Sequence, residues 1–480
     1  MSLYECVVCG YVYDEDAEGV KWQDLPEDWT CPLCFSDKTY FQEKEGHSEK
    51  DVGERTGDAG TASTPAATEV TIDSYLRDWR RTNDEVETTM VNIHAIAVSG
   101  TSVVEPMRSK VPVISWDQVL LRGAQLQKVP LDGDTEVITR TVIGPRARVP
   151  LVIDTPVYIT HMSFGALSRE AKLSLASGSA AVGTAMCSGE GGILQESMER
   201  SHRYIFEYVP NEYSVTEENL RSVDAIEIKI GQSAKPGMGG HLPGNKVTRE
   251  IAEVRGRPEG EDIISPSHFS DISTPEDLKT KVDWLRDASG GKPIGVKVAA
   301  GHVEGDLKVA LAANPDFITV DGRSGATGAA HKVVKDSVSI PTVFALHRAR
   351  RLLDNEGADG VSLLITGQFR VSSDIAKALA MGADAVAIGT AAMMAIGCQQ
   401  YRICHTGNCP VGIATQDPLL RERFDIEISA KRLENYLRVS TEELRDFARL
   451  TGRTDVHQLS IDDLCTANSE ISENTYIEHV

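Results

Sequence analysis

The sequence predicts an α/β protein: a (β/α)8 TIM barrel with a small cysteine-rich metal-binding module at its N-terminus. Eight short apolar runs alternate with helical patterns from residue 157 onward, as expected for such a barrel. Four of the nine cysteines lie within the first 41 residues. A length of 480 residues suits one small module followed by one large domain.

The first element, residues 1–41, contains two CxxC pairs: Cys6 with Cys9, and Cys31 with Cys34. Each pair can direct two thiolates at one ion, and four thiolates in a tetrahedral array suit iron or zinc. The spacing alone therefore leaves an iron site and a zinc ribbon open.

The next elements follow from composition. Residues 42–70 have almost no apolar side chains and many Gly, Ser, Thr, Glu and Lys, which predicts a flexible linker. We expect an N-terminal extension of the large domain at 71–156, the barrel at 157–425 and a helical tail at 426–480.

Charge and hydropathy exclude several classes of protein. A formal charge of −22 disfavours binding to nucleic acid or to an anionic membrane, because phosphates would be repelled. The N-terminus lacks the pattern of a signal peptide, so we expect a cytoplasmic protein. The apolar stretch 378–397 contains Asp384 and predicts a buried strand between two helical pieces. Nine cysteines in such a chain indicate metal or redox chemistry rather than disulfides.

The predicted barrel strands are the runs VYIT, GTAMCS, AIEIKI, GVKVAA, FITVDG, TVFALH, LLITG and AVAIGT. Active-site residues of such barrels follow the carboxyl ends of the strands. The last two runs lead into Gly367 and Gln368, and into Gly389 and Thr390, where backbone N–H groups can approach a phosphate. Lys297 also follows a run, as a salt-bridge partner or as a cation beside a flavin.

The head module resembles rubredoxin, in the segments CGYVYD and LPEDWTCPLC that surround its cysteine pairs. This resemblance implies one redox-active iron held by four cysteines and a role as an electron carrier. The sequence departs from the family in a shorter segment between the pairs and in Phe35, which stands where the family usually has glycine.

The large domain resembles the FMN-binding synthase domain of glutamate synthases, above all the short archaeal-type members. Six motifs in order carry the likeness: HMSFGALS, CSGEGG, EIKIGQSAKPGMGGHLPGNKV, SPSHFSDISTPEDL, DGRSGATGA and CQQYRICHTGNCPVGIATQ. The resemblance covers about residues 75 to 425 and implies an oxidoreductase that reduces 2-iminoglutarate, formed from 2-oxoglutarate and ammonia, to glutamate.

The resemblance also assigns residues to roles. Lys235 and Arg255 match positions that hold the oxoacid carboxylates, and Glu190 matches a glutamate near the reacting carbon. The positions matching flavin contacts are Ser163, Gln232, Lys297, Asp321, Gly325, Gly367, Gln368, Gly389 and Thr390. Cys187, beside this motif, is interpreted as a small buried residue rather than a reactive thiol.

Three further cysteines, Cys398, Cys404 and Cys409, have the spacing with which this family binds a [3Fe-4S] cluster. A zinc knuckle is the alternative, and His405 is a candidate for an additional ligand, which leaves a [4Fe-4S] cluster open.

Departures from the family motifs leave the substrate open. Met238 and His241 replace a carboxylate and an amide, and Ala326 replaces a glycine. A different imine or oxoacid is therefore an alternative substrate, and a redox relay without turnover is a second alternative. The sequence shows no glutaminase domain, so the amine would come from solution or from a separate glutaminase subunit. Electrons would reach the head from a rubredoxin reductase or another donor. The oligomeric state, including a homo-oligomer, stays open.

Overall fold

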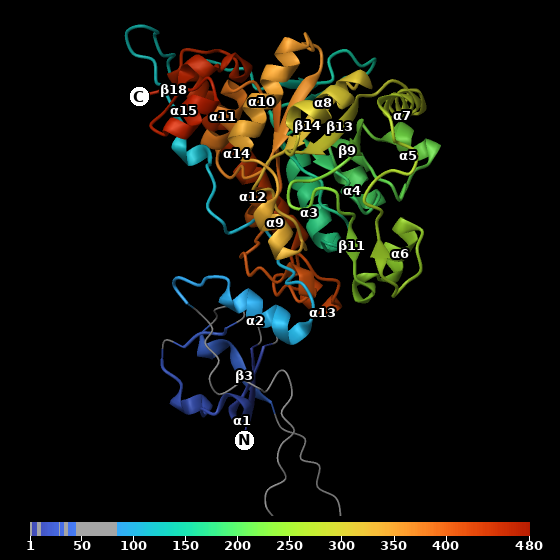
Figure 1. Cartoon of the computed structure of the whole chain (residues 1–480), viewed down its shortest axis with the longest axis vertical. Helices are drawn as coiled ribbons and strands as arrows, with labels where there is room; N and C mark the ends of the chain where they lie inside the picture. Colours follow the sequence, from blue (N-terminus) through green and yellow to red (C-terminus); the bar gives the residue numbers. More distant parts are fainter. Residues whose placement is uncertain (1, 7–10, 28, 33–36, 45–83) are drawn as a thin grey trace, which may run out of the picture. The chain divides into compact units, whose positions relative to one another are not determined.

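The computed structural model describes residues 2–6, 11–27, 29–32, 37–44 and 84–480 (Figure 1). The chain divides into two compact units, residues 1–104 and residues 105–480. Cys9, Cys34, Phe35 and most of the predicted linker 42–70 lie outside the described residues.

The first unit contains a three-stranded antiparallel sheet in which β1 (Leu3–Cys6) pairs with both β2 (Val12–Asp14) and β3 (Phe41–Lys44). Short turns of helix follow at α1 (Glu15–Glu18), η1 (Trp22–Asp24) and η2 (Lys38–Tyr40), and α2 (Met90–Ser99) belongs to the same unit.

Aromatic rings fill the head module. Trp22 stacks on Tyr4 with ring centroids 4.5 Å apart and meets Trp29 at 5.4 Å, edge to face. Cys6 and Cys31 are buried in the same module. Ring packing of this kind stabilises a domain too small for a large aliphatic core.

The second unit is a closed barrel of eight parallel strands, which confirms the predicted fold. The strands are β7 (Val157–Ile159), β8 (Ala185–Cys187), β9 (Arg203–Tyr208), β10 (Ala225–Lys229), β13 (Ile294–Ala299), β14 (Phe317–Asp321), β15 (Ser362–Thr366) and β16 (Ala385–Ile388). They close in chain order, with β16 pairing with β7. The stretch 378–397 forms a buried strand between two helices, as predicted.

Helices and two-stranded sheets lie outside the barrel strands. The helices are α3 (Arg169–Ala180), α4 (Gln195–Arg200), α5 (Glu217–Ser222), α6 (Arg249–Arg255), α7 (Pro275–Ala288), α8 (Val303–Ala312), α9 (Lys332–Ser337), α10 (Thr342–Asn355), α11 (Ser372–Ala380), α12 (Thr390–Ala395), α13 (Pro418–Arg421), α14 (Ile426–Leu450) and α15 (Ser469–Asn474). Outside the barrel, β5 (Thr141–Ile143) pairs with β6 (Leu151–Ile153), and β11 (His241–Leu242) with β12 (Ile263–Ile264).

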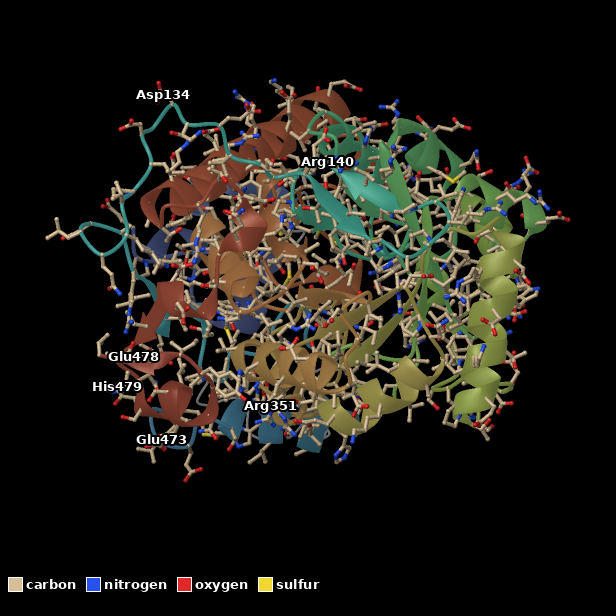
Figure 2. The ribbon with its side chains drawn as sticks, turned by 90° about the horizontal axis from the view of Figure 1, so that it is seen from above. Asp134, Arg140, Arg351, Glu473, Glu478 and His479 are labelled. Atoms are coloured by element: carbon tan, nitrogen blue, oxygen red, sulfur yellow. The ribbon has the colours of Figure 1, made fainter. Side chains whose placement is uncertain are left out.

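The last strands join the two ends of this unit, because β17 (Leu464–Thr466) pairs with both β18 (Glu478–His479) and β4 (Leu120–Leu121). Glu473, Glu478 and His479 lie together at one edge of the molecule seen from above (Figure 2). There Arg122 and Glu478 form an exposed ion pair of 2.6 Å, which contributes little stability.

Local sequence explains where the helices begin and pack. Thr274 caps α7 through a capping box with Asp277, and Pro275 begins the first turn between them. α14 packs along α3 with a buried stripe of Leu433, Leu437 and Leu444. Among the helices of the described residues, none is both long and apolar enough to cross a bilayer.

One predicted strand was wrong. The run TVFALH forms the start of α10, and the strand missing from the prediction is β9. The buried residues Thr342, Leu346, Ala349 and Leu353 recur with helical spacing beyond the run, so the period is 3.6 and not 2. β9 has the sequence RYIFEY, with charged residues at its first and fifth positions.

Candidate active site

The residues predicted for the site gather at one end of the barrel. Ser163, Glu190, Gln232, Asp321, Gly367 and Gly389 all stand at, or within four residues after, the carboxyl ends of their strands. Since parallel strands of a closed barrel end at the same rim, the structure brings these residues together. Lys297 lies within β13, and its buried side chain points into the barrel toward Glu207 and Glu227.

Glu190 and Lys229 form the central ion pair. The Lys229 ammonium donates to Oε2 of Glu190 at 2.7 Å, and the two side chains are only 11% and 18% exposed. Burial opposes ionisation of Glu190, but the charges of Lys229 and Lys235 outweigh it and hold the pKa at about 2. The site therefore presents a fixed carboxylate at neutral pH.

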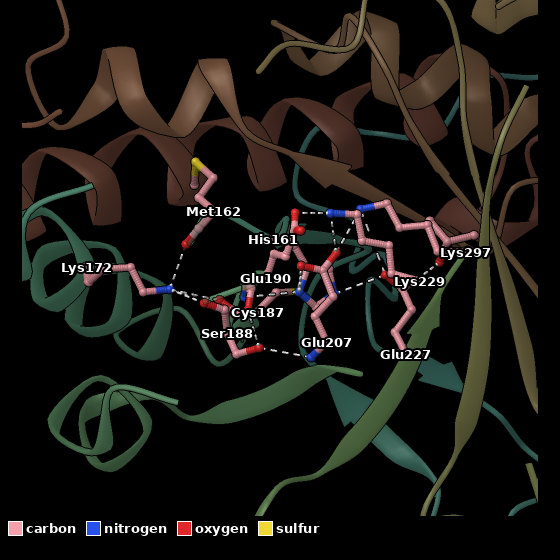
Figure 3. Close-up of polar contacts among 12 residues, drawn as sticks. His161, Met162, Lys172, Cys187, Ser188, Glu190, Glu207, Glu227, Lys229 and Lys297 are labelled. Carbon is pink, nitrogen blue, oxygen red and sulfur yellow. Dashed lines mark hydrogen bonds and ion pairs between the residues drawn. The ribbon is translucent and has the colours of Figure 1, made fainter. Parts of the chain in front are cut away.

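A buried ionic network lies beneath this pair (Figure 3). His161 Nε2 lies 3.0 Å from Glu227, and its Nδ1 lies 3.7 Å from Glu207. Lys297 approaches Glu207 at 3.7 Å and Glu227 at 4.0 Å. Register explains the assembly, because Glu227 is paired with Glu207 and Lys229 with Lys297 on adjacent parallel strands.

The pKa values of this network follow from its charges. Burial disfavours the charged form of Lys297, but Glu207 and Glu227 reverse that effect and raise its pKa. Burial likewise opposes ionisation of Glu227, whereas His161 and Lys297 lower its pKa. Lys297 is thus a cation held by two carboxylates. A salt-bridge partner is one of the two roles that its sequence position left open.

His161, Glu207 and Glu227 also bring three ligand atoms within 4.8 Å of one another. Such a group could bind a metal ion in isolation. Here, however, Lys229 and Lys297 lie within 4.0 Å of the carboxylate oxygens and already balance their charge. We therefore interpret the group as an internal ionic network rather than a metal centre.

Lys172 joins the loops that follow β7 and β8. Its Nζ donates to the backbone carbonyls of Met162, Cys187 and Ser188 at 3.0, 3.2 and 2.8 Å. The side chain is fully buried, and burial lowers its pKa to about 7. One lysine therefore fixes the backbone just after His161 and just before Glu190. Cys187 itself is fully buried, and burial raises its pKa, in agreement with an inert thiol.

Replacing Lys172 with Met should destabilise the barrel by about 3 kcal/mol, because three buried carbonyls lose their shared donor. The measurement is the free energy of unfolding from denaturant titration. Lys279→Met, on a lysine side chain 50% exposed, is the matched control and should change stability by no more than about 0.5 kcal/mol. Equal effects in the two variants would contradict a bracing role for Lys172.

Lys235 and Arg255 flank Glu190 from the segment after β10. Arg255 Nη2 donates to the Phe164 carbonyl at 2.8 Å, and its guanidinium lies over the Tyr213 ring, 5.5 Å from the centroid. Arg255 is only 8% exposed and its Nε has no hydrogen-bond partner. Burial lowers the pKa of Lys235, and the charge of Glu190 opposes that shift.

The loop that covers Glu190 contains two glycines at close contacts. A Cβ at Gly240 would lie 2.4 Å from Oε1 of Glu190, and one at Gly239 would lie 1.8 Å from the Ser265 carbonyl oxygen. Their neighbours in the chain are open to solvent, since Met238 is 40% exposed and the His241 side chain 56%. Nε2 of His241 lies 2.8 Å from Oδ2 of Asp262. The two departures from the family motif thus lie on the outer side of this loop.

The residues predicted to hold a phosphate, called the phosphate cradle below, are closely packed at the rim of the barrel. Gly367 has φ +118°, and a Cβ there would lie 2.6 Å from the Gly322 carbonyl oxygen. A Cβ at Gly389 would lie 2.9 Å from Thr160, and Thr390 begins α12. Gln368 has a positive φ of 66°, and Asp321 accepts from the Ser233 N–H and hydroxyl beside Gly325 at 3.0 and 2.8 Å.

The three cysteines of the CQQYRICHTGNC segment lie in one loop after α12. Gln400 Nε2 approaches the Cys398 sulfur at 3.2 Å. Burial and the charges of Cys398 and Cys409 raise the pKa of Cys404 to about 12, as expected for thiols gathered at one place. His405 is half-buried, and its Nδ1 has no hydrogen-bond partner.

The donor set of this loop consists of three thiols. In the described part of the chain, only His161, Glu207 and Glu227 bring three ligand atoms within 4.8 Å of one another, so at least two of the three cysteine sulfurs lie further apart than that. Cysteine thiolates are the usual ligands of iron–sulfur clusters, and the chemistry of this donor set suits such a cluster.

Sequence reasoning missed several residues of the site, namely His161, Lys172, Glu207, Glu227 and Lys229. A signal was present for two of them, because Glu227 and Lys229 stand two residues apart in an otherwise apolar run. Residues two apart on a strand share a face, and charged residues on a buried face indicate an internal polar site.

Comparison with known proteins agrees with this geometry. Residues 113–454 match the family described as "Conserved region in glutamate synthase", and residues 3–41 match "Rubredoxin". A "Glutamate synthase large subunit-like protein" of Rhizobium meliloti is 36% identical over 85% of this chain and 94% of its own. An "Archaeal glutamate synthase [NADPH]" of Methanocaldococcus jannaschii is 40% identical over 76% of this chain and 72% of its own. The chain therefore belongs to the glutamate synthase family of oxidoreductases and includes a rubredoxin domain.

Proposed function

We propose that this protein reduces 2-iminoglutarate, formed from 2-oxoglutarate and ammonia or an amine, to glutamate. The observation that carries the proposal is the Glu190–Lys229 pair at the rim of the barrel, with the cations Lys235 and Arg255 near Glu190. A fixed carboxylate beside several cations suits a dicarboxylate substrate whose nitrogen gains protons. A redox relay needs no such arrangement.

Three redox groups belong to the proposal. The cradle at Gly367, Gln368, Gly389 and Thr390 would hold the phosphate of FMN, and Ser163, Gln232, Lys297, Asp321 and Gly325 would line its ring and ribityl chain. FMN supplies hydride transfer. Cys398, Cys404 and Cys409 would hold a [3Fe-4S] cluster, and the cysteines of the rubredoxin domain one iron.

The residues of the chain bind the oxoacid, orient the nitrogen and hold a proton near it. Lys235 and Arg255 attract the two carboxylates of the oxoacid. Glu190 accepts a hydrogen bond from ammonia or the imine nitrogen and orients it. Lys229, fixed on Glu190, holds a proton 2.7 Å from that carboxylate, and Glu190 and Glu207 outweigh burial to raise its pKa.

The proposal is tested with anaerobically reduced holoenzyme mixed with candidate oxoacids and an ammonium salt. We expect 2-oxoglutarate with ammonium to reoxidise the flavin absorbance and to yield glutamate. Oxaloacetate and pyruvate, which differ in chain length or lack the second carboxylate, are the comparison substrates. If no oxoacid reoxidises the flavin faster than buffer does, the proposed function is wrong.

A different imine or oxoacid is the second candidate, because Met238 and His241 change the chemistry of the loop that covers Glu190. The same experiment separates the two candidates, since faster reoxidation by another oxoacid or by an organic amine would favour the second. A separate glutaminase subunit as ammonia source, a rubredoxin reductase as electron donor and a cytoplasmic location remain part of the proposal.

A further inference from the structure

Lys246 is a buried lysine that reaches into the cysteine loop. It ends the short turn η5 (Gly244–Lys246) and is only 6% exposed. Its Nζ donates to the Cys404 carbonyl at 2.7 Å. Its Cε lies so near Gly407 that a Cβ at that glycine would be 3.0 Å away. The ammonium thus sits against the loop that carries the three thiols.

The ammonium has little to balance it in the surrounding protein. Within the described residues, no carboxylate lies within 4.0 Å of Nζ, and the Cys404 carbonyl is its one hydrogen-bond acceptor. By comparison, Lys229 and Lys297 have carboxylate partners, and Lys172 has three carbonyls. Burial of a charge with so few partners is unfavourable unless a counter-charge is present.

The thiols of the cysteine loop can supply negative charge as thiolates, and the hydrogen bond to the Cys404 carbonyl fixes the Lys246 ammonium against this loop. When cysteines ligate iron they are thiolates, so a cluster in this loop would provide the missing counter-charge.

We propose that Lys246 is the electrostatic partner of the iron–sulfur cluster and raises its reduction potential. This inference rests on the proposed function, which places a [3Fe-4S] cluster in the loop. The cluster gains one electron as the ferrous iron of the rubredoxin domain becomes ferric, and no bond or proton is exchanged. Because reduction adds one negative charge, a fixed ammonium nearby stabilises the reduced cluster more than the oxidised one.

The test is a potentiometric titration of full-length holoenzyme, with EPR of the cluster as readout and iron content measured in parallel. Lys246→Met removes both charge and donor, Lys246→Gln keeps a donor without charge, and Lys246→Arg keeps the charge. Lys377→Met is the matched control, because Lys377 is 8% exposed and donates to the Trp116 carbonyl away from the cysteines.

We expect lower midpoint potentials in the Met and Gln variants, with Lys246→Arg and Lys377→Met close to the unmodified protein. If Lys246→Met has the same midpoint potential as the unmodified protein, the inference is wrong. It is also wrong if Lys246→Gln keeps the original potential, because the hydrogen bond alone would then account for the effect. If both neutral variants lose the cluster, the iron content of Lys246→Arg decides the question. A cluster retained in Lys246→Arg supports the role of the charge, and a cluster lost there overturns the inference. Unmodified protein without an iron–sulfur signal would instead overturn the proposed function itself.

Discussion

Replacing Glu190 with glutamine should lower the turnover number for 2-oxoglutarate and ammonium by about a hundredfold or more. The amide occupies the same space but carries no negative charge, so it orients ammonia or the imine nitrogen less strongly. Flavin content should stay unchanged, since Glu190 faces Lys229 and the covering loop rather than the phosphate cradle. Steady-state kinetics with a chemically reduced donor measure the effect.

The matched control is Glu196→Gln, which removes a carboxylate that is 32% exposed and paired with Arg169 and Arg200 on the surface. Its turnover should equal that of the unmodified protein. Comparable loss in the two variants, or none in Glu190→Gln, would contradict the assigned role.

The pH dependence of stability provides an independent check on Glu190. Its pKa of about 2 in the folded protein lies below its ordinary value of 4.5, so its stabilising contribution is fully present above pH 4.5. That contribution is lost as the pH falls from 4.5 toward 2. Unfolding free energies of the unmodified protein should therefore fall more steeply across this window than those of Glu190→Gln.

Replacing Cys31 with alanine should abolish turnover driven through a rubredoxin reductase while leaving turnover with chemically reduced flavin intact. Cys31 is fully buried in the rubredoxin domain, and its loss removes a ligand of the proposed iron. Metal analysis should show one iron fewer per chain. Cys465→Ala, on a buried cysteine in β17, is the control and should affect neither route.

This prediction also tests why the two parts share one chain. A flexible linker of 29 residues, as predicted for 42–70, has a root-mean-square span of roughly 30 Å and maintains an effective concentration on the order of millimolar. Free rubredoxin domain should therefore rescue the Cys31→Ala variant only at high concentration. Unchanged reductase-driven turnover in the variant would show that the head is not on the electron path.

The sequence was sufficient for the fold where local patterns were simple. β10 and β13 stand out as apolar runs, and the residues after them fall at the predicted rim. β9, the segment RYIFEY, was not among the predicted strands, although it contributes Glu207 to the interior of the barrel.

The pairing of the site residues could not be predicted from sequence. Lys229 binds Glu190 from a neighbouring part of the barrel, and Lys297 meets Glu207 two strands away. These contacts depend on strand register and side-chain direction, which no local motif encodes. The resemblance supplied Glu190 and Lys297 but not the partners that fix their charge.

The loop over Glu190 also determines where this protein can diverge. Gly239 and Gly240 admit no side chain without a collision, whereas Met238 and His241, on either side, are open to solvent. Substitutions at the two outer positions therefore alter the chemical character of the loop without shifting its backbone. These two residues can change while the Glu190 carboxylate stays in place, so a randomised library at 238 and 241 should retain folded protein far more often than one at 239 and 240.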